Sequence, residues 1–280
     1  MRGTSSTSFG EVLRQAEAAF SAAPGSLEAT ADGLFTVADA IDSSNQLVRM
    51  LSDAGRPAEL KEEVVQTLFG ARVPAVVLDA AREVVSRRWS EQEDILDALE
   101  LLGVSALLEQ AQQEGVLEQV ENELVEVSRL IDAAPDLTIA LDDLREDPSQ
   151  REAIITRLLT AHVHRLTVLL SARAVGRRSD LKPSTRVQQF ARFATDRRRR
   201  SFALVTSAVP LSDAQRSRLQ GLLTRIYGRE VDMNLQVDRD VVGGLRIQIG
   251  DDLYDATVLA RLSRAEQQLV ALTIPDAPAS

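Results

Sequence analysis

The sequence contains no cysteine among its 280 residues. This absence excludes disulfide bonds and thiolate zinc sites, and it fits a reducing compartment. Aromatic residues are also scarce at 4% of the chain, although hydrophobic residues make up 44%. So few rings beside so much alanine, leucine and valine favour helices that pack through aliphatic stripes.

Long apolar runs are missing as well. No segment reaches the roughly 18 consecutive apolar residues that a membrane-spanning helix needs. The first residues, MRGTSSTSFGE, have no apolar run behind their single arginine, so they do not form a secretory signal. We therefore expect a soluble protein without membrane insertion, built as one large domain or two to three small ones.

Charge is distributed unevenly along the chain, which has a formal net charge of −10. Residues 90–152 hold 18 acidic and 3 basic side chains, a net charge of −15. Residues 177–200 hold 9 basic and 2 acidic side chains, a net charge of +7. The negative total argues against general nucleic-acid binding, and opposite fields on adjacent segments favour docking to a protein over small-molecule chemistry.

An internal repeat relates two segments of the first 200 residues. Residues 26–53, SLEATADGLFTVADAIDSSNQLVRMLSD, align without gaps with residues 116–143, VLEQVENELVEVSRLIDAAPDLTIALDD. Nine of the 28 positions are identical, each at an interval of 90 residues, and the apolar positions stay in phase. Chance similarity between leucine-rich helices is the alternative, but the preserved phase favours a duplicated helical bundle.

The apolar spacing within the repeat predicts helices and their ends. Five apolar residues of the first copy recur at steps of seven, three, four and seven, as on one stripe of a helix. They are Leu27, Leu34, Val37, Ile41 and Val48. Asn45 and Pro135 share a repeat position and predict a helix break. Gly25 and Gly115 share another, where a helix C-terminus needs a left-handed residue.

The apolar period changes after Arg200. Alternation of apolar and polar residues predicts strands at 201–210, 231–238 and 245–250, followed by a turn and short strand within 251–255. Helices are predicted at 214–227 and 258–272. Leu219, Leu222, Leu223 and Ile226 form one apolar face of the first of these helices.

The predicted architecture is therefore mainly α. Two tandem helical bundles, residues 1–89 and 90–200, precede a small α+β domain, residues 201–280. The order of elements in this last domain is β-α-β-β-β-α.

The pair Gly243-Gly244 raises the question of a phosphate-binding loop. A dinucleotide fingerprint needs Gly-x-Gly-x-x-Gly between a strand and a helix, whereas this pair lies between two predicted strands, and no lysine follows as in a P-loop. We predict a bulge or close backbone contact there and a two-residue hairpin turn at Gly250-Asp251. A nucleotide-binding enzyme remains a third hypothesis, which rests only on the glycine pair.

Two other groups carry potential metal ligands. Asp251, Asp252 and Asp255 lie in one segment, whereas oxygen-only sites usually gather carboxylates from several segments, so an exposed acidic turn is the better interpretation. His162 and His164 are the only histidines, and on a helix residues two apart point in different directions. We predict no metal site, no cofactor and no catalytic residue.

Arg197, Arg198, Arg199 and Arg200 form a run of four arginines. The simplest interpretation is a solvated helix end whose cations suit the helix dipole, and docking onto an acidic protein surface is the main alternative. The run is thus a candidate partner-facing basic patch. A nucleic-acid-binding adaptor is the alternative function, against which stand the acidic surroundings and the lack of interleaved aromatic residues.

The segment 237–262, VDRDVVGGLRIQIGDDLYDATVLARL, resembles the signature of the delta subunit of F-type ATP synthase, called the oligomycin-sensitivity-conferring protein in mitochondria. That signature runs roughly Val-Asp-x-x-Leu-Ile-Gly-Gly, a strand, Gly-Asp, and Asp-Gly-Ser-Val before a helix rich in Arg and Leu. Its turn positions are matched by Asp238, Gly243, Gly244, Gly250, Asp251 and Asp255. The two predicted bundles resemble the longer delta subunits, in which the single bundle is duplicated.

The resemblance implies a mechanical function without an active site. In this family the subunit joins the catalytic head to the peripheral stalk, as part of the stator in proton-driven ATP synthesis. Its helical bundle grips the N-terminal helix of an alpha subunit, and its C-terminal domain meets the C-terminus of the b subunit. The resemblance also implies one copy per complex, no bound nucleotide, no nucleic acid, and a peripheral position on the cytoplasmic face of the cell membrane.

Overall fold

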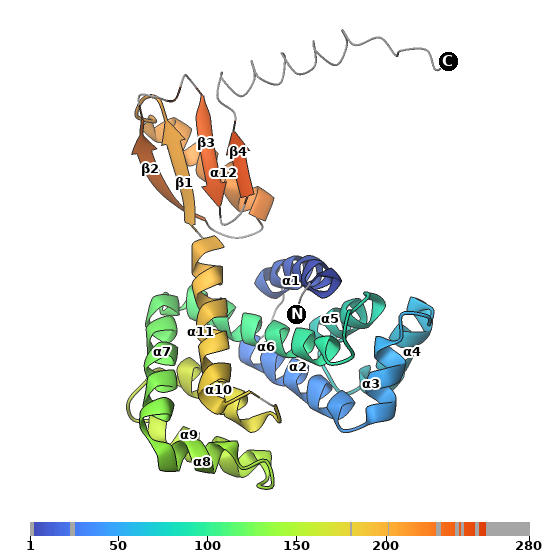
Figure 1. Cartoon of the computed structure of the whole chain (residues 1–280). Helices are drawn as coiled ribbons and strands as arrows, with labels where there is room; N and C mark the ends of the chain where they lie inside the picture. Colours follow the sequence, from blue (N-terminus) through green and yellow to red (C-terminus); the bar gives the residue numbers. More distant parts are fainter. Residues whose placement is uncertain are drawn as a thin grey trace, which may run out of the picture. The chain divides into compact units, whose positions relative to one another are not determined.

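The computed structural model describes residues 3–22, 26–179, 181–200, 202–227, 231–238, 241, 244–249 and 252–255. The chain forms two compact units, Met1–Ala194 and Thr195–Ser280. The first is helical, and the second contains a small sheet (Figure 1). The predicted class, mainly α with a small α+β domain at the end, is thus confirmed. The predicted domain limits at residues 89 and 200 stay predictions.

Helices build the described part of the first unit, and α11 continues into the second (Figure 1). Their bounds are α1 (Thr4–Ala22), α2 (Leu27–Asp42), α3 (Asn45–Ser52), α4 (Ala58–Phe69), α5 (Ala75–Ser86), α6 (Asp94–Gln113), α7 (Leu117–Ala133), α8 (Pro135–Asp142), α9 (Pro148–Leu159), α10 (Arg165–Gly176) and α11 (Pro183–Arg200). Each of α7 to α10 begins 90 residues after its counterpart among α2 to α5. This interval equals that of the sequence repeat, and the breaks predicted at Asn45 and Pro135 are confirmed.

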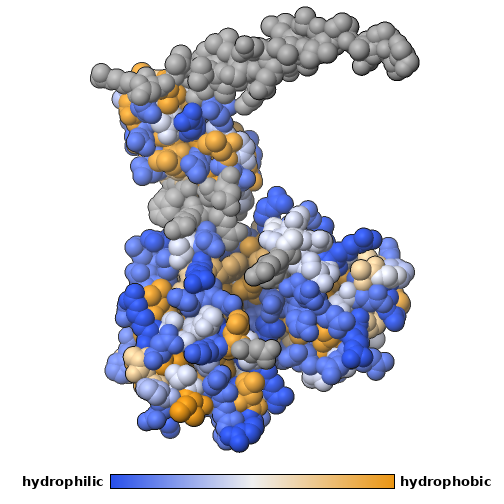
Figure 2. Space-filling model, viewed as in Figure 1, coloured by the Kyte–Doolittle hydropathy of each residue, from blue (hydrophilic) through white to orange (hydrophobic). Residues whose placement is uncertain are grey.

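The surface of the first unit is mostly hydrophilic on the face that Figure 2 shows, although apolar residues interrupt it over the part formed by α7, α8 and α9. Large exposed hydrophobic side chains of this part include Leu130, Ile139, Leu144 and Leu158. A single exposed leucine is ordinary on a protein surface. A group of exposed apolar side chains with charged neighbours is a better indication of a binding surface. Among the helices that the structure describes, none is long and apolar enough to cross a membrane.

The helical unit has two halves that follow the repeat, with α1 to α5 in the first and α7 to α11 in the second. Helix α6 lies between these halves in the sequence and packs against both. It follows α5 and precedes α7, and it packs against helices of both halves, namely α1, α2, α5, α7 and α10. Fifteen of its 20 residues are buried, because its sequence DILDALELLGVSALLEQAQQ places apolar residues on every side. The two halves therefore bury one continuous hydrophobic core instead of two separate ones.

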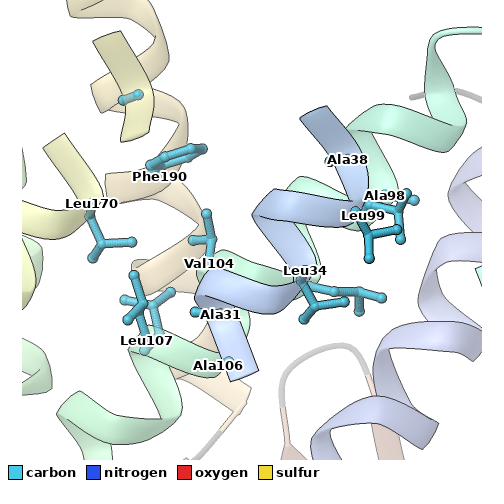
Figure 3. Packing of buried hydrophobic residues seen from close by; sticks show 14 of the residues in the cluster. Ala31, Leu34, Ala38, Ala98, Leu99, Val104, Ala106, Leu107, Leu170 and Phe190 are labelled. Carbon is cyan, nitrogen blue, oxygen red and sulfur yellow. The ribbon is translucent and has the colours of Figure 1, made fainter. Parts of the chain in front are cut away.

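The sides of α6 contact different halves of the chain (Figure 3). Leu34 of α2 lies beside Leu99, whereas Leu170 of α10 and Phe190 of α11 lie on the side of Leu107. All five side chains are buried. Because α6 carries apolar residues toward both halves, removing either half would expose part of the core.

Gly103 of α6 is required by the close approach of α2. A Cβ added at Gly103 would stand 2.3 Å from Cε1 of Phe35. We expect Gly103→Ala to lower the free energy of unfolding by about 1–3 kcal/mol, because overpacking outweighs the gain in helix propensity. Gly10→Ala in α1 is the matched control, since an added Cβ there meets no atom within 4 Å, and it should raise the stability by about 0.5–1 kcal/mol. Urea unfolding measures both, and a stabilised Gly103→Ala variant would contradict this packing.

Gly115 ends α6 as predicted. Its φ of +73° lies in the left-handed region that favours glycine. The Val116 N–H donates to the Ala111 carbonyl at 2.8 Å, and the Gly115 N–H donates to the Gln112 carbonyl at 3.1 Å. These two bonds make a Schellman motif, which satisfies carbonyls at the helix end. Gly25 lies outside the described residues.

The second unit holds a sheet with the strand order β2-β1-β3-β4. Its elements are β1 (Phe202–Ser207), α12 (Asp213–Tyr227), β2 (Asp232–Val237), β3 (Leu245–Ile249) and β4 (Asp252–Asp255). β1 and β2 are parallel and are connected through α12, whereas β3 is antiparallel to both β1 and β4. The predicted order β-α-β-β-β is confirmed within the described residues, and the predicted helix at 258–272 lies outside them.

Helix α12 packs on the sheet through a narrower stripe than the sequence suggests. Leu219 and Leu223 are buried in a core with apolar residues of β1 and β3. Leu222 and Ile226, which share the predicted apolar face, are 43% and 62% exposed. A small sheet covers only part of the helix circumference, so these two side chains remain on the surface.

Candidate functional site

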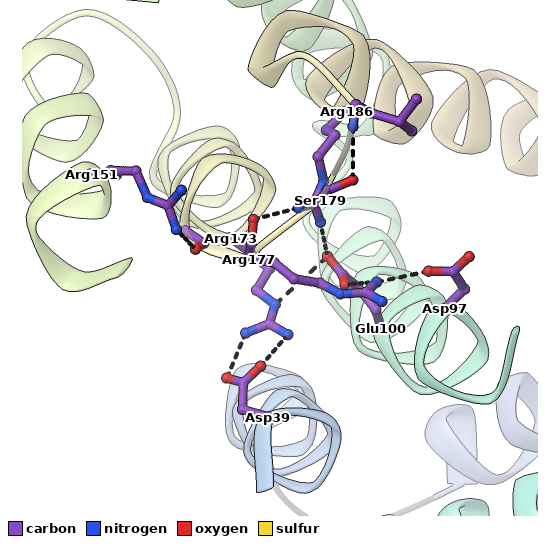
Figure 4. Close-up of polar contacts among 10 residues, drawn as sticks. Asp39, Asp97, Glu100, Arg151, Arg173, Arg177, Ser179 and Arg186 are labelled. Carbon is purple, nitrogen blue, oxygen red and sulfur yellow. Dashed lines mark hydrogen bonds and ion pairs between the residues drawn. The ribbon is translucent and has the colours of Figure 1, made fainter. Parts of the chain in front are cut away.

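A carboxylate is buried in the middle of the helical unit. Glu100 of α6 is only 2% exposed. Its Oε1 accepts a hydrogen bond of 2.9 Å from Nη2 of Arg186, and its Oε2 accepts one from Nη1 of Arg177. Nε of Arg173 stands 3.7 Å from the same Oε1. Figure 4 shows these arginines converging on Glu100 from α10 and α11.

Arg173 connects this network to the first half of the chain. Its Nη1 and Nη2 donate to the two carboxylate oxygens of Asp39 on α2 at 2.7 and 2.8 Å. Its guanidinium also lies 4.6 Å from the centre of the Phe35 ring, which is a cation–π distance. The bidentate pair is the stronger contact, because both partners are charged and two parallel bonds fix the geometry.

The charges of the network balance. Arg177 also pairs with Asp97 at 2.9 Å, so three arginines face three carboxylates. Burial lowers the pKa of Arg186, although the charge of Glu100 opposes this. Burial also lowers the pKa values of Arg173 and Arg177, but their carboxylate partners outweigh it, so both pKa values lie above the ordinary one.

A further buried cation contacts the C-terminus of α10. Arg151 of α9 is 1% exposed, and its Nη2 donates to the carbonyl of Gly176, the last residue of α10, at 2.5 Å. A cation at this end stabilises the helix dipole. Glu152 fills the space where Gly176 lacks a side chain, and burial raises the pKa of this glutamate. Lys61, 90 residues before Arg151, is also buried, which lowers its pKa.

The first half contains a partly exposed counterpart of this ion pairing. Arg87 is the C-cap of α5, and Arg177, 90 residues later, is the C-cap of α10. Its Nη1 donates to Glu11 of α1 at 2.6 Å, with side chains 31% and 41% exposed. The same arginine position thus pairs with a partly exposed glutamate in one half and with the buried Glu100 in the other.

His164 has a structural role. It is the N-cap of α10, where its Nδ1 accepts a hydrogen bond of 3.3 Å from the Leu166 N–H. Its own N–H donates to Glu123 at 2.9 Å, and Thr167 Oγ1 donates to the same carboxylate at 2.5 Å. Burial raises the pKa of Glu123, but these hydrogen bonds outweigh it and leave the pKa below its ordinary value. Across the described ranges, no group of three or more His, Cys, Asp or Glu residues could hold a metal ion.

The predicted signature residues lie at strand ends where they are described. The Asp238 N–H donates to the Ser207 carbonyl at 2.9 Å, and the Asp238 carbonyl accepts from the Val241 N–H at 3.2 Å. Gly244 has a φ of +88°, which favours glycine. Asp255 pairs with Arg246 across β3 and β4 at 3.5 Å. Gly243, Gly250 and Asp251 lie outside the described residues, so their predicted turns stay predictions.

The arginine run ends α11. The side chain of Arg197 is 0% exposed, so it does not contribute to an exposed basic patch as predicted. Arg198 is half-buried. For Arg198, Arg199 and Arg200 the partner-facing role stays a prediction. The nucleic-acid alternative is weakened by the burial of one of its four cations.

The ion network was not predicted from the sequence, although one signal for it exists. Glu100 lies within DILDALELLGV, a segment with apolar residues on every side of the helix. A carboxylate in such a helix must find a buried cation, because an unpaired buried charge is strongly unfavourable. Which arginines pair with it depends on how distant helices pack.

The sequence matches known proteins over most of its length. Residues 104–269 match the family model described as ATP synthase delta (OSCP) subunit. The ATP synthase subunit delta of Beutenbergia cavernae is 38% identical over 269 residues, which cover 96% of this chain and 99% of that protein. The protein of the same name from Frankia alni is 35% identical over 240 residues, which cover 86% and 87%.

A solved structure is also similar. A chain of the mitochondrial ATP synthase hexamer of Toxoplasma gondii matches with 18% identity and a TM-score of 0.32, covering 63% of this chain and 96% of that one. The family match begins at residue 104, inside α6, whereas the Beutenbergia cavernae protein aligns with the helices before it as well.

Proposed function

The chain belongs to the ATP synthase delta (OSCP) subunit family, and from this premise we propose that it joins the catalytic head of an F-type ATP synthase to the peripheral stalk. The division of the chain into two compact units, each with its own hydrophobic core, supports this proposal. A connector needs two separate contact surfaces on stable bodies. We further propose that the chain has no active site of its own and is present in one copy per complex.

The helical unit is proposed to contact the head through the N-terminal helix of an alpha subunit. Helix-in-groove docking is a common mode of recognition between a helical bundle and a peptide. The net charge of −15 over residues 90–152 would favour a partner helix that carries lysine or arginine. The shared core around α6 would keep this unit stiff under the torque of the rotor.

The second unit is proposed to contact the C-terminus of the b subunit. Several large apolar side chains are exposed on it although its core is small. They are Leu204, Val209, Leu222, Ile226, Val237, Leu253 and Tyr254. Such side chains suit a surface that is covered in a complex. The complex would place the chain on the cytoplasmic face of the cell membrane, without insertion into it.

Calorimetry with two peptides tests the proposal. The full chain is titrated with a peptide of the alpha N-terminal helix, with a peptide of the b C-terminus, and with each in the presence of the other. We expect both to bind, each with unchanged affinity when the other is present, because the contacts lie on separate units. Binding of neither peptide would refute the connector function, and competition between them would refute the assignment of one partner to each unit.

A further inference from the structure

The two halves of the helical unit have corresponding helices, but their outer surfaces differ. One such difference lies at α8 and at its counterpart α3, 90 residues earlier. Ile139 of α8 is 69% exposed, and the equivalent residue of α3 is the exposed Arg49. Both residues are exposed at the same repeat position, so the fold does not require an isoleucine on the surface.

The geometry of α8 directs Ile139 away from the core. Leu141 is 1% exposed and Leu137 is half-buried, one helical turn apart on the inner side. Ile139 lies midway between them in sequence and thus on the opposite side of the helix. Asp136 and Asp142, at three residues before and after it, are both exposed.

Two further leucines are exposed close by in the sequence. Leu130 near the end of α7 is 43% exposed, and Leu144 just after α8 is 40% exposed. Their counterparts in the first half are Ala40 and Ala54. The second half therefore presents large apolar side chains where the first half presents small ones.

The charge around these side chains also differs between the halves. Residues 132–149 contain 6 acidic and 1 basic side chain, whereas residues 42–59 contain 3 acidic and 2 basic ones. The single cation, Arg145, binds Asp143 through two hydrogen bonds of 2.9 and 2.7 Å. These bonds lower the pKa of Asp143 to about 2, so its carboxylate stays ionised at neutral pH.

We propose that the α8 surface, defined as Leu130, Asp136, Ile139, Asp142 and Leu144, binds a basic amphipathic segment of another subunit of the complex. This inference rests on the proposed function, because it takes the partner from the same assembly. Ile139 anchors the apolar side of the segment, and the two aspartates attract its lysines or arginines. The acidic charge disfavours nucleic acid and anionic lipid as occupants.

Photo-crosslinking in the assembled complex identifies the occupant. A photo-reactive phenylalanine analogue is placed at position 139 of the full chain, or at position 49 as the matched control. Each form is added to purified ATP synthase that has been depleted of this subunit. We expect crosslinks from position 139 to a lysine- or arginine-rich segment of another subunit, at least about tenfold above those from position 49. Crosslinks to a second copy of this chain, or none above the control, would overturn the proposal.

A substitution that copies the first half gives an independent measurement. Ile139→Arg introduces the residue found at Arg49, and both side chains are exposed, so folding is retained. We expect it to weaken binding of the chain to the depleted complex by about tenfold or more. Leu68→Arg, at a 37% exposed leucine of the first half, should leave binding unchanged.

These outcomes separate the two hypotheses. Equal binding of Ile139→Arg and the unchanged chain would overturn the docking surface and leave the connector function intact. Failure of the unchanged chain to join the depleted complex would overturn the connector function, and this inference with it.

Discussion

Replacing Glu100 by glutamine is expected to lower the free energy of unfolding by about 3–5 kcal/mol. The substitution retains the shape of the side chain but removes the charge that Arg177 and Arg186 contact directly. Both arginines are mostly buried, so solvent cannot replace the lost carboxylate. The cost comes from leaving buried cations uncompensated, and it exceeds the net stabilisation that the intact network contributes.

Glu11→Gln is the matched control for this prediction. Glu11 pairs with Arg87 as Glu100 pairs with Arg177, but the side chain of Glu11 is 41% exposed. Water and salt screen such a pair, so we expect a loss below about 1 kcal/mol. Urea unfolding of both variants, followed by circular dichroism at 222 nm, measures the difference. Equal losses for the two substitutions would show that the burial of Glu100 does not determine its contribution.

Removing residues 201–280 is expected to abolish binding to the b subunit and to leave binding to the alpha peptide unchanged. The truncated chain keeps the whole helical core, because the hydrophobic cluster of the first unit ends at Ala194. It loses the sheet and α12, which carry the proposed stalk-binding surface. A loss of at least about 100-fold in affinity, or about 2.7 kcal/mol, is expected for the b peptide.

Pulldown and calorimetry with the two peptides test this truncation. The thermal unfolding of the truncated chain is recorded first, because a folded helical unit is required for the comparison. Retained alpha binding with no b binding would agree with one partner per unit. Undiminished binding of the b peptide would move the stalk contact to the helical unit and contradict the assignment.

Much of the fold could be predicted because the signals for it are local. The 3.6-residue spacing of apolar side chains predicts a helix, and particular residues predict where it ends. The start of α3 at Asn45 and the termination of α6 at Gly115 were therefore both predictable. Alternation of apolar and polar residues likewise located β1, β2 and β3, and a one-sided apolar face located α12. The interval of 90 residues followed from comparing the chain with itself, and the segment 237–262 pointed to the family.

The candidate site was less predictable, since its residues are far apart in the sequence. Glu100 pairs with arginines 77 and 86 residues away, and Arg173 pairs with Asp39 at a separation of 134 residues. No spacing rule connects such residues, because their contact depends on how α2, α10 and α11 pack around α6. The prediction for Arg197 failed for the same reason: a run of arginines indicates a surface position, but burial is decided by the neighbouring elements.

The sequence by itself thus determined the helices, the repeat, the strand order along the chain and the family, because periodicity and turn chemistry act over a few residues. Only the tertiary structure decided that α6 packs against both halves and that the buried Glu100 pairs with arginines of α10 and α11 and with the arginine just after α10. It also decided that Ile139 lies outward among acidic residues, whereas Arg49 occupies the equivalent position in the first half. Burial and ion pairing are properties of packed surfaces, and packing joins residues that the chain order keeps apart.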